Sequence, residues 1–355
     1  MHSRPKINST IVCLLAAMFF GACGRSSPPP VTSTPGIHVF TSDETGGNVI
    51  ILDPDRGEVV ERIAVGKRPR GIRLSNDAKQ LLVALSGSPI AGPGVDESTL
   101  PPADRSADGI GIVDLTTRAV VRKFHSGQDP ESFAISPDGK TLYVSNEDAA
   151  EMSVLDLAGG SVTHRVKVGE EPEGVTVRPD GREVYVTCEG DNEVVAVDTG
   201  KMEVVAKMKT AARPRAVVFT ADGATAFVTN ENGGAVTVID TASHTVANTI
   251  QMPRAANNPV PPRPMGAILS KDGKQLFVSL GRAKAVAVID VASRQVARTI
   301  DDVGARPWGI GLSPDGKKLY TANGPSGDVS VVDIESGKVE KRVAVGGSPW
   351  GIAVR

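Results

Sequence analysis

The chain has 355 residues and a mass of 36.9 kDa, and its 38 glycines and 25 prolines make it rich in turn-forming residues. Its 39 lysines and arginines against 41 aspartates and glutamates give a net charge of −2, which argues against a basic nucleic-acid-binding domain. Three cysteines are too few for a disulfide framework.

Residues 1–22 have the pattern of an export signal. Arg4 and Lys6 precede an apolar run over 11–20, which is too short to span a bilayer. The run ends in small residues directly before Cys23, which resembles the bacterial lipoprotein signal, where this cysteine is acylated and becomes the N-terminus. We therefore expect a signal peptide over 1–22 and lipidation of Cys23, with an ordinary secretory signal as the alternative.

The stretch 23–36 is expected to be the lipidated cysteine and a flexible tether, because it is rich in Pro, Ser and Gly. By resemblance to Gram-negative sorting, Gly24 after the cysteine implies the periplasmic face of the outer membrane, with the membrane contacted through the lipid anchor. Cleavage leaves Cys188 as the remaining thiol, which is expected to be a buried small hydrophobe.

Beyond residue 36 the sequence repeats a unit of about 42 residues, which predicts copies of one supersecondary structure. About 19 extra residues, within 86–108, interrupt the first interval, and about 8, within 253–262, interrupt the fourth. The marker of the repeat is a proline followed by small and apolar residues, at Pro69, Pro130, Pro172, Pro214, Pro264, Pro307 and Pro349.

Each unit holds four short runs rich in β-branched residues and bounded by turn residues, which predicts four strands. In the second unit the runs are 132–136, 141–145, 152–156 and 162–168. Asp-Gly pairs such as 138–139 predict tight hairpin turns. Sustained helical periodicity is missing from the sequence, so we expect almost no helix.

The two ends of the repeat region hold parts of one unit. The region opens with second, third and fourth strands at 38–41, 48–53 and 58–65, and it closes with a lone first strand at 350–354. A ring whose C-terminal strand completes the N-terminal unit accounts for this order and leaves no open sheet edge. We therefore predict an all-β, seven-bladed β-propeller over 37–355, with four antiparallel strands per blade.

The second-strand segments YVSN at 143–146, YVTC at 185–188 and FVTN at 227–230 resemble the YVTN-type β-propeller repeat over essentially the whole of 37–355. The segment GQDPESF at 127–133 and the final Gly-x-x-Pro-Trp-Gly resemble the subgroup associated with alcohol catabolism that depends on pyrroloquinoline quinone (PQQ). The family resemblance implies binding or scaffolding. The subgroup resemblance implies support of a periplasmic PQQ-dependent dehydrogenase.

In a four-stranded blade, the marker prolines are expected around one mouth of the central channel. The residues flanking them then form two rings, with acids in units two and three, arginines in units one and four to six, and two tryptophans side by side in units six and seven. We predict that this mouth binds a ligand through Arg68, Arg70, Arg213, Arg215, Arg263, Arg306, Trp308 and Trp350.

Such a pocket suits a small anionic ligand, for example a PQQ-like quinone tricarboxylate, or a periplasmic protein, because arginines bind carboxylates and indoles stack. The alternative is that the charges pair between blades and the tryptophans close the channel. The acids also offer oxygen ligands for Ca²⁺, unless they are solvated or paired with arginine. The predicted metal ligands are Asp129, Glu131, Glu171 and Glu173, with Glu147 and Glu189 at the ends of the second strands as further candidates.

No haem-attachment, nucleophile-elbow or zinc-protease motif occurs in the sequence. We therefore expect a lipid-anchored accessory protein that binds a ligand or a protein, catalyses nothing, requires no cofactor and does not bind nucleic acid. One alternative is a lactonase or lyase in which a divalent metal at the acidic residues polarises a carbonyl group. Another is a structural or adhesion protein of the cell envelope.

Overall fold

The computed structural model describes residues 1–2, 36–90, 96, 99–254 and 259–355. Contacts divide the chain into residues 1–36 and 37–355. The predicted signal peptide, the lipidation of Cys23 and nearly all of the predicted tether fall on residues 3–35, which lie outside the described residues. Among the described helices, none has both the length and the apolar composition to cross a membrane.

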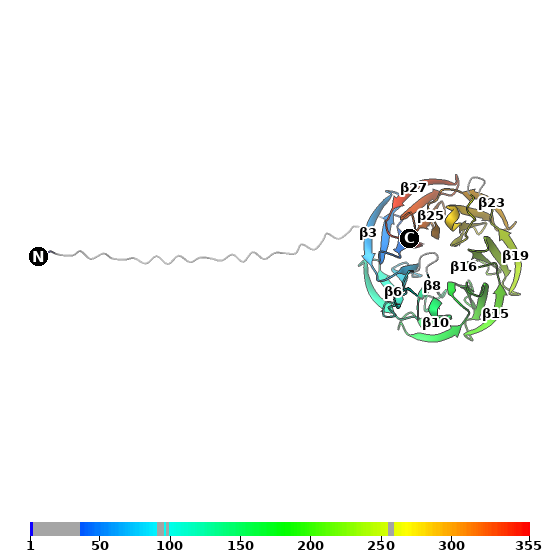
Figure 1. The fold of residues 1–355 in the computed structure, drawn as a ribbon, viewed down its shortest axis with the longest axis horizontal. Helices are drawn as coiled ribbons and strands as arrows, with labels where there is room; N and C mark the ends of the chain where they lie inside the picture. Colours follow the sequence, from blue (N-terminus) through cyan, green and yellow to red (C-terminus); the bar gives the residue numbers. More distant parts are fainter. Residues whose placement is uncertain (3–35, 91–95, 97–98, 255–258) are drawn as a thin grey trace. The chain divides into compact units, whose positions relative to one another are not determined.

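Residues 37–355 form seven four-stranded antiparallel sheets arranged around a ring (Figure 1). We number the sheets as blades from the first marker proline. Blades 1 to 3 consist of β4(Pro69–Leu74), β5(Gln80–Leu85), β6(Gly109–Asp114), β7(Ala119–Phe124); β8(Pro130–Ile135), β9(Thr141–Asn146), β10(Glu151–Asp156), β11(Val162–Lys167); and β12(Pro172–Val177), β13(Glu183–Cys188), β14(Glu193–Asp198), β15(Glu203–Lys209).

Blades 4 to 7 repeat the same order from the inner to the outer strand. They consist of β16(Pro214–Phe219), β17(Thr225–Asn230), β18(Ala235–Asp240), β19(Thr245–Gln251); β20(Ala267–Leu269), β21(Gln275–Ser279), β22(Val286–Asp290), β23(Gln295–Ile300); β24(Pro307–Leu312), β25(Lys318–Asn323), β26(Asp328–Asp333), β27(Lys338–Ala344); and β28(Pro349–Val354), β1(Val39–Asp43), β2(Asn48–Asp53), β3(Glu58–Ala64).

Blade 7 joins the two ends of the repeat region. Strand β28 pairs with β1 in a register that places Val39 opposite Val354. Just beyond this pair, the N–H of His38 donates to the carbonyl of Arg355 at 2.8 Å, and the N–H of Arg355 donates back at 3.0 Å. The predicted seven-bladed propeller and its closure by the C-terminal strand are therefore confirmed.

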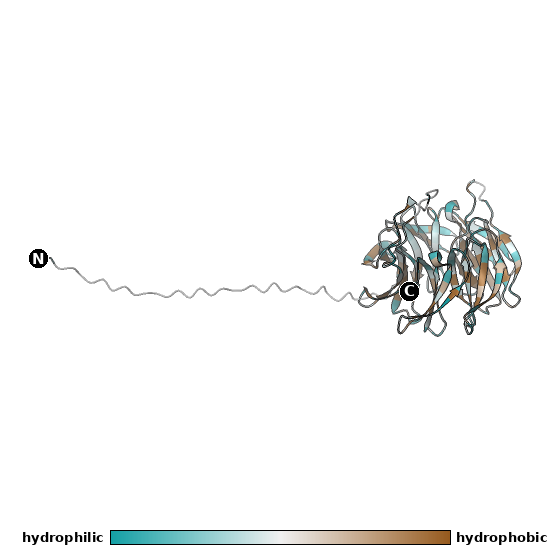
Figure 2. Ribbon diagram, turned by 60° about the horizontal axis from the view of Figure 1, so that its bottom comes forward, coloured by the Kyte–Doolittle hydropathy of each residue, from teal (hydrophilic) through white to brown (hydrophobic). Residues whose placement is uncertain are grey.

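The hydrophobic core lies in layers between neighbouring blades. The second and third strands of a blade are buried on both faces, as the continuous apolar run of β14 shows, whereas the outer strand β15 alternates between exposed and half-buried residues. Figure 2 shows hydrophobic residues concentrated on the strands. Cys188 is buried in the layer between blades 2 and 3, as expected, and burial raises the pKa of its thiol to about 12.

The turns follow the sequence expectation. Gly139 adopts a φ of +73°, which an L-residue rarely tolerates, and the hydroxyl of Ser136 donates to Asp138 within the same turn. Helix is almost absent from the described residues, where short 3-10 helices follow the second strands of blades 2 and 5. These are η2(Glu147–Ala149) and η3(Gly281–Ala283).

Six of the seven inner strands begin at the marker prolines, one or two residues earlier than predicted in blades 2 and 7, whereas β20 begins at Ala267, three residues after Pro264. In blade 2, Pro130 lies opposite Asn146, and the register then shifts before Phe133 pairs with Val144. A proline at the first strand position followed by a β-bulge breaks the alternation that reveals a strand in sequence. The bulge also changes the direction of the side chain that follows the proline.

A hydroxyl group from each of several second strands connects two blades. Thr187 Oγ1 in blade 3 accepts from the N–H of Gly174 in its own bulge and donates to the carbonyl of Arg215 in blade 4, both at 2.7 Å. The equivalent donations to the next blade come from Ser42, Ser145, Thr229 and Ser279. This contact gives a physical reason for the Ser or Thr that recurs in the second-strand segments.

Candidate functional site

The seven residues that directly follow the marker prolines form a layer across the channel mouth, which we call the mouth layer. Its first five members are buried and its two tryptophans are half-buried. The next residue along each inner strand is Gly, Ala or Ser, because the strands approach so closely that a Cβ on Gly174 would collide with the carbonyl of Arg215. The members of the mouth layer are Arg70, Glu131, Glu173, Arg215, Met265, Trp308 and Trp350.

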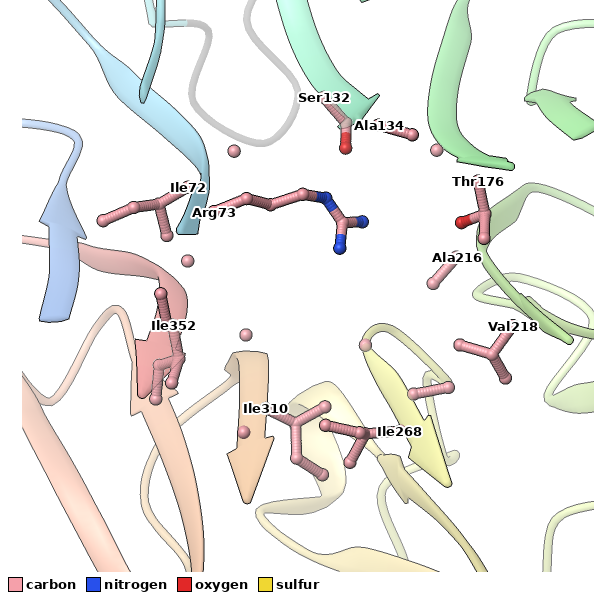
Figure 3. A pocket seen from close by; sticks show the side chains of 18 of the residues that line it. Ile72, Arg73, Ser132, Ala134, Thr176, Ala216, Val218, Ile268, Ile310 and Ile352 are labelled. Atoms are coloured by element: carbon pink, nitrogen blue, oxygen red, sulfur yellow. The ribbon is translucent and has the colours of Figure 1, made fainter. Parts of the chain in front are cut away.

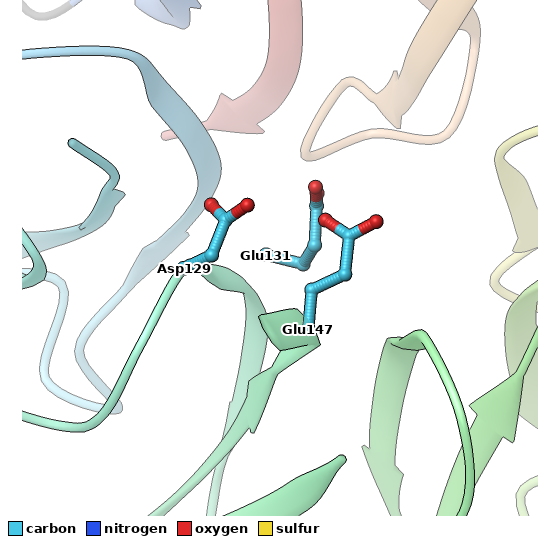
Figure 4. Close-up of side chains that lie close together, drawn as sticks. All are labelled: Asp129, Glu131 and Glu147. Carbon is cyan, nitrogen blue, oxygen red and sulfur yellow. The ribbon is translucent and has the colours of Figure 1, made fainter. Parts of the chain in front are cut away.

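Arg70 in blade 1 lies among three carboxylates of blade 2. Its guanidinium forms ion pairs with Asp129 and Glu131, and Nη1 lies 3.6 Å from Glu147. Figure 4 shows these three carboxylates turned toward one another. The Arg70 side chain is only 2% exposed, so it supplies the positive charge that carboxylates buried together require.

Arg215 in blade 4 plays the same part for the acids of blades 3 and 4. It lies 2.5 Å from Glu173, 3.2 Å from Glu189 and 2.9 Å from Glu231. Burial by itself lowers the pKa of Arg215, but the three carboxylates outweigh it and raise that pKa above its ordinary value. The pairing between blades that we gave as an alternative is thus what the structure shows for Arg70 and Arg215.

Glu147 links the two groups. It lies within the carboxylate cluster of Asp129 and Glu131 and also within that of Glu173 and Glu189. Its side chain is 25% exposed, more than that of any other carboxylate in these clusters. Burial raises the pKa of Glu147 to about 8, with Glu173 and Asp129 adding to the increase and Arg70 opposing it. Glu147 is therefore a carboxyl group that meets solvent and titrates near neutral pH.

The position of Glu147 is fixed by its surroundings. It opens η2, and its backbone N–H donates to the carbonyl of Asp129 at 3.0 Å. The neighbouring Asp148 forms an ion pair with Arg105 at 2.6 Å and accepts a hydrogen bond from Ser88 at 3.1 Å. Arg105 and Ser88 belong to the 86–108 insertion, so the described part of this insertion holds η2 at the mouth.

Arg306 is weakly neutralised within the charge network of blades 4 to 6. Its guanidinium lies 4.4 Å above the ring of Trp308, and its nearest carboxylate is Glu231 at 3.8 Å. Burial lowers its pKa despite Glu231, and the like charges of Arg215, Arg282 and Arg213 add to the decrease. Trp308 stacks on Trp350 with ring centroids 5.8 Å apart. A ligand with a polar ring could pack against the two stacked indoles, and the neighbouring cation would stabilise negative charge that develops on that ligand.

The residues before the marker prolines have an unusual backbone. Five charged residues there adopt a left-handed φ between +39° and +59°, which non-glycine residues rarely do. Strain of this kind concentrates at functional sites, where it fixes the direction of a side chain. The five residues are Arg68, Asp129, Glu171, Arg213 and Arg306.

Some predicted site residues lie apart from this network. Arg68 pairs with Glu44 at 3.0 Å, Arg263 donates to Asn232, and Glu171 is exposed. The predicted metal set is therefore not one cluster, because Asp129 and Glu131 lie in one group, Glu173 lies in another, and Glu171 lies in neither. Each group already contains a guanidinium, so a bound Ca²⁺ would have to compete with Arg70 or Arg215.

The structure adds Glu231 to the two glutamates that the sequence analysis named at the ends of second strands. Glu147, Glu189 and Glu231 each follow the last residue of a second strand, at the same position of the repeat. Arg213 links two of them, at 2.8 Å from Glu189 and 3.3 Å from Glu231. Glutamate recurring at this position is the sequence signal that indicated Glu147 and Glu189, and it could have identified Glu231 as well.

Below the mouth layer, a cavity of about 830 Å³ occupies the central channel (Figure 3). Its walls are the inner strands, and its lining extends to Asn76 and Pro179, which lie in turns beyond the far ends of β4 and β12. Five members of the mouth layer also line this cavity and bound it at one end. They are Glu173, Arg215, Met265, Trp308 and Trp350.

A closed seven-bladed propeller with a charged mouth defines the class of protein, and the comparisons with known proteins define the family. The model of a family described as lactonase, 7-bladed beta-propeller, matches residues 169–353, and the chain belongs to this family. A second model, described as YNCE-like beta-propeller, matches residues 95–181. Neither description refers to the YVTN repeat or to the PQQ subgroup. Among curated proteins, no match is found.

Solved structures share the fold at low sequence identity. Hydrazine synthase of Kuenenia stuttgartiensis is 24% identical with a TM-score of 0.66, over 80% of this chain and 88% of that one. The periplasmic gluconolactonase PpgL of Pseudomonas aeruginosa is 21% identical with a TM-score of 0.71, over 90% and 98%. A protein of Lactobacillus plantarum is 18% identical with a TM-score of 0.73, over 90% and 99%.

The family match corrects one prediction from the sequence. We expected an accessory module that binds a ligand or a protein without catalysing a reaction, and membership of a lactonase family overturns this expectation. The match agrees instead with the lactonase given as an alternative. The expectation failed because it depended on catalytic motifs of contiguous residues, whereas the acids at this mouth come from different blades.

Proposed function

We propose that the chain is a hydrolase of sugar lactones whose active site is the charged mouth, with Glu147 as general base and Arg306 as the stabiliser of negative charge. The observation that carries the proposal is the position of Glu147, which is the half-buried and most accessible member of two otherwise buried carboxylate clusters. A general base works best when its pKa lies near the working pH, and the raised pKa of Glu147 meets this condition.

The reaction uses water and no covalent intermediate. Glu147 accepts a proton from a water molecule as its oxygen bonds to the lactone carbonyl carbon, and the carbonyl oxygen becomes negative. Arg306 stabilises this oxyanion, while the indole of Trp308 packs against the sugar ring. The bond from carbon to the ring oxygen then breaks, and that oxygen takes the proton back from Glu147, which yields a hydroxy acid.

Arg215 connects the two catalytic residues electrostatically, since its charge affects the pKa of both Glu147 and Arg306. Because Arg70 and Arg215 already neutralise the buried acids, we propose that the reaction requires no metal. Dialysis against a chelator should then leave the rate unchanged. Loss of activity that Ca²⁺ restores would instead support the metal-assisted form of the reaction.

The first test is hydrolysis of glucono-1,5-lactone, chosen because one structural neighbour is a gluconolactonase. We expect Glu147→Gln to lower kcat roughly hundredfold or more, as removal of a general base does. Glu203→Gln, which removes an exposed carboxylate on the outer strand β15, is the matched control and should be fully active. Full activity of Glu147→Gln would contradict the role of Glu147.

The pH dependence gives a second test of the same residue. The base must be deprotonated, so kcat should rise with pH and level off above about 8, where the raised pKa of Glu147 lies. Rates are measured after subtracting the spontaneous hydrolysis of the lactone. A rate that falls between pH 7 and 9 would indicate that Glu147 acts as a proton donor, which contradicts the proposed mechanism.

A further inference from the structure

The channel cavity contains one arginine that the proposed function does not use. Arg73 lies in the inner strand β4, four residues after the marker proline Pro69. The equivalent residues of the other six blades are small or apolar, apart from one threonine. They are Ala134, Thr176, Val218, Ile268, Gly311 and Ala353. Arg73 is the only charged residue at this level of the channel.

The guanidinium of Arg73 is fixed in direction and available to a ligand. Nε donates to the carbonyl of Phe133 in the next blade at 2.7 Å, which holds the guanidinium plane in place. Figure 3 shows the rest of the group extending into the cavity. Within the described residues, no carboxylate lies within 4.0 Å of it, and Nη1 and Nη2 make no hydrogen bond.

An unpaired charge in this place is energetically unfavourable. The Arg73 side chain is accessible to solvent inside the channel. The surrounding strands nevertheless desolvate its guanidinium, and this desolvation lowers its pKa. The nearby hydroxyl of Ser132 donates to no described residue and is half-buried beside Phe133. An anion bound to both groups would offset the cost of desolvation.

The remaining walls determine what kind of anion fits. Ile72, Val218, Ile268, Ile310 and Ile352 line the cavity, and slightly more than half of its surface is apolar. One guanidinium with two free nitrogen donors matches one carboxylate, whereas a doubly charged phosphate would keep a charge against apolar walls. The volume of about 830 Å³ lies within the range of small-molecule sites.

We propose that the channel is a second binding site, which takes an amphipathic monocarboxylate with its head on Arg73 and its apolar body along the inner strands. The cavity lies below the mouth layer and reaches the far turns at Asn76 and Pro179, so the ligand enters from the face opposite the charged mouth. The cavity also contacts the inner side of the mouth layer at Arg215 and Trp308, but the residue that would bind the carboxylate, Arg73, is not part of the proposed lactonase site. The proposal therefore does not depend on that function.

Octanoate is the probe, and binding is measured by isothermal titration calorimetry on the chain from residue 37 onward and on the full chain. Wild type should bind one octanoate, and octanol should bind at least tenfold more weakly. Arg73→Gln should weaken octanoate binding roughly tenfold to hundredfold, as expected for hydrogen bonds to a charged group. Lactone hydrolysis by this variant should be unchanged.

Two further variants separate a binding role from a structural one. Arg73→Lys keeps the charge and should retain part of the affinity, and this variant remains informative if Arg73→Gln does not fold. Val218→Phe fills the cavity and should weaken octanoate binding while leaving Arg73 intact. Glu147→Gln changes only the mouth and should bind octanoate as wild type does.

Four results would overturn the proposal. These are no octanoate binding by wild type, unchanged binding by Arg73→Gln, loss of binding in Glu147→Gln, and inorganic phosphate binding as tightly as octanoate. The third result would indicate that the carboxylate of octanoate binds at the charged mouth and not at Arg73. The fourth would show that the apolar walls contribute nothing.

Discussion

At the scale of single residues, Arg306 at the mouth is expected to lower the stability of the fold while contributing to activity. Arg306 has a left-handed φ of +52°, a conformation that costs a non-glycine residue about 1 kcal/mol. A glycine would relieve this cost, and the presence of arginine indicates that its side chain is needed. The hypothesis that Arg306 stabilises the oxyanion therefore predicts opposite effects of one substitution on stability and on activity.

We expect Arg306→Gly to keep or raise the Tm and to lower kcat/KM roughly hundredfold, as loss of an oxyanion donor does. Arg294→Gly is the matched control, since Arg294 has a φ of +57° in the hairpin between β22 and β23, away from the mouth. It should gain similar stability and keep full activity. If Arg306→Gly is destabilised and fully active, the arginine has a structural role.

At the scale of secondary-structure elements, the second strand of each blade is the connecting piece. Its hydroxyl satisfies the N–H of the bulge in its own blade and the carbonyl of the next blade. The bulge would otherwise leave a buried polar group without a partner. The recurring Ser or Thr is therefore required by the bulge, and the bulge is required to direct the mouth layer.

Thr187→Val tests this connection because it preserves shape and removes the hydroxyl. Two groups then lose their partner, so the free energy of unfolding should fall by about 1–3 kcal/mol, measured by denaturant titration. Thr187→Ser keeps the hydroxyl and should cost much less. Equal losses in the two variants would show that packing of the methyl group, and not hydrogen bonding, is what matters.

The fold could be predicted from the sequence because it depends on local features that every blade repeats, whereas the contacts at the mouth differ from blade to blade. The repeated proline, the turns and the permuted ends were sufficient for the ring, since each blade has the same local chemistry. The strand starts were misplaced because the bulge removes the alternation there. Arg70 and Arg215 were recognised as mouth residues, but sequence order could not show that buried carboxylates surround them.

Two further residues were missed for a related reason. The predicted site combined the residues that flank the prolines with the glutamates at the ends of the second strands in the two acidic units, so Glu231 in the arginine-bearing fourth unit was not included. Arg73 lies farther along an inner strand, where the other blades carry small or apolar residues. Comparing each repeat position across all blades would have singled out both residues, although it could not have shown their contacts.

At the scale of the whole molecule, the ring depends on one strand contributed from the far end of the chain. Removal of residues 349–355 deletes β28, leaves blade 7 with three strands and opens the channel wall. We expect the truncated protein to lose its cooperative thermal transition, as followed by circular dichroism.

A peptide of residues 349–355 should bind the exposed edge of β1 and restore a cooperative thermal transition, with fluorescence of Trp350 reporting its binding. A peptide of the same composition in scrambled order is the control. Restoration by the scrambled peptide would show that a specific register with β1 is not needed.

The strand order of blade 7 also determines when the protein can become complete as it is made. Strand β1 leaves the ribosome before the strands of blade 1, but its inner partner β28 is synthesised about 300 residues later. During that interval β1 has an unpaired edge, which is prone to pairing with other chains. Ring closure consequently waits for the synthesis of β28, and newly made chains need protection from aggregation until that strand arrives.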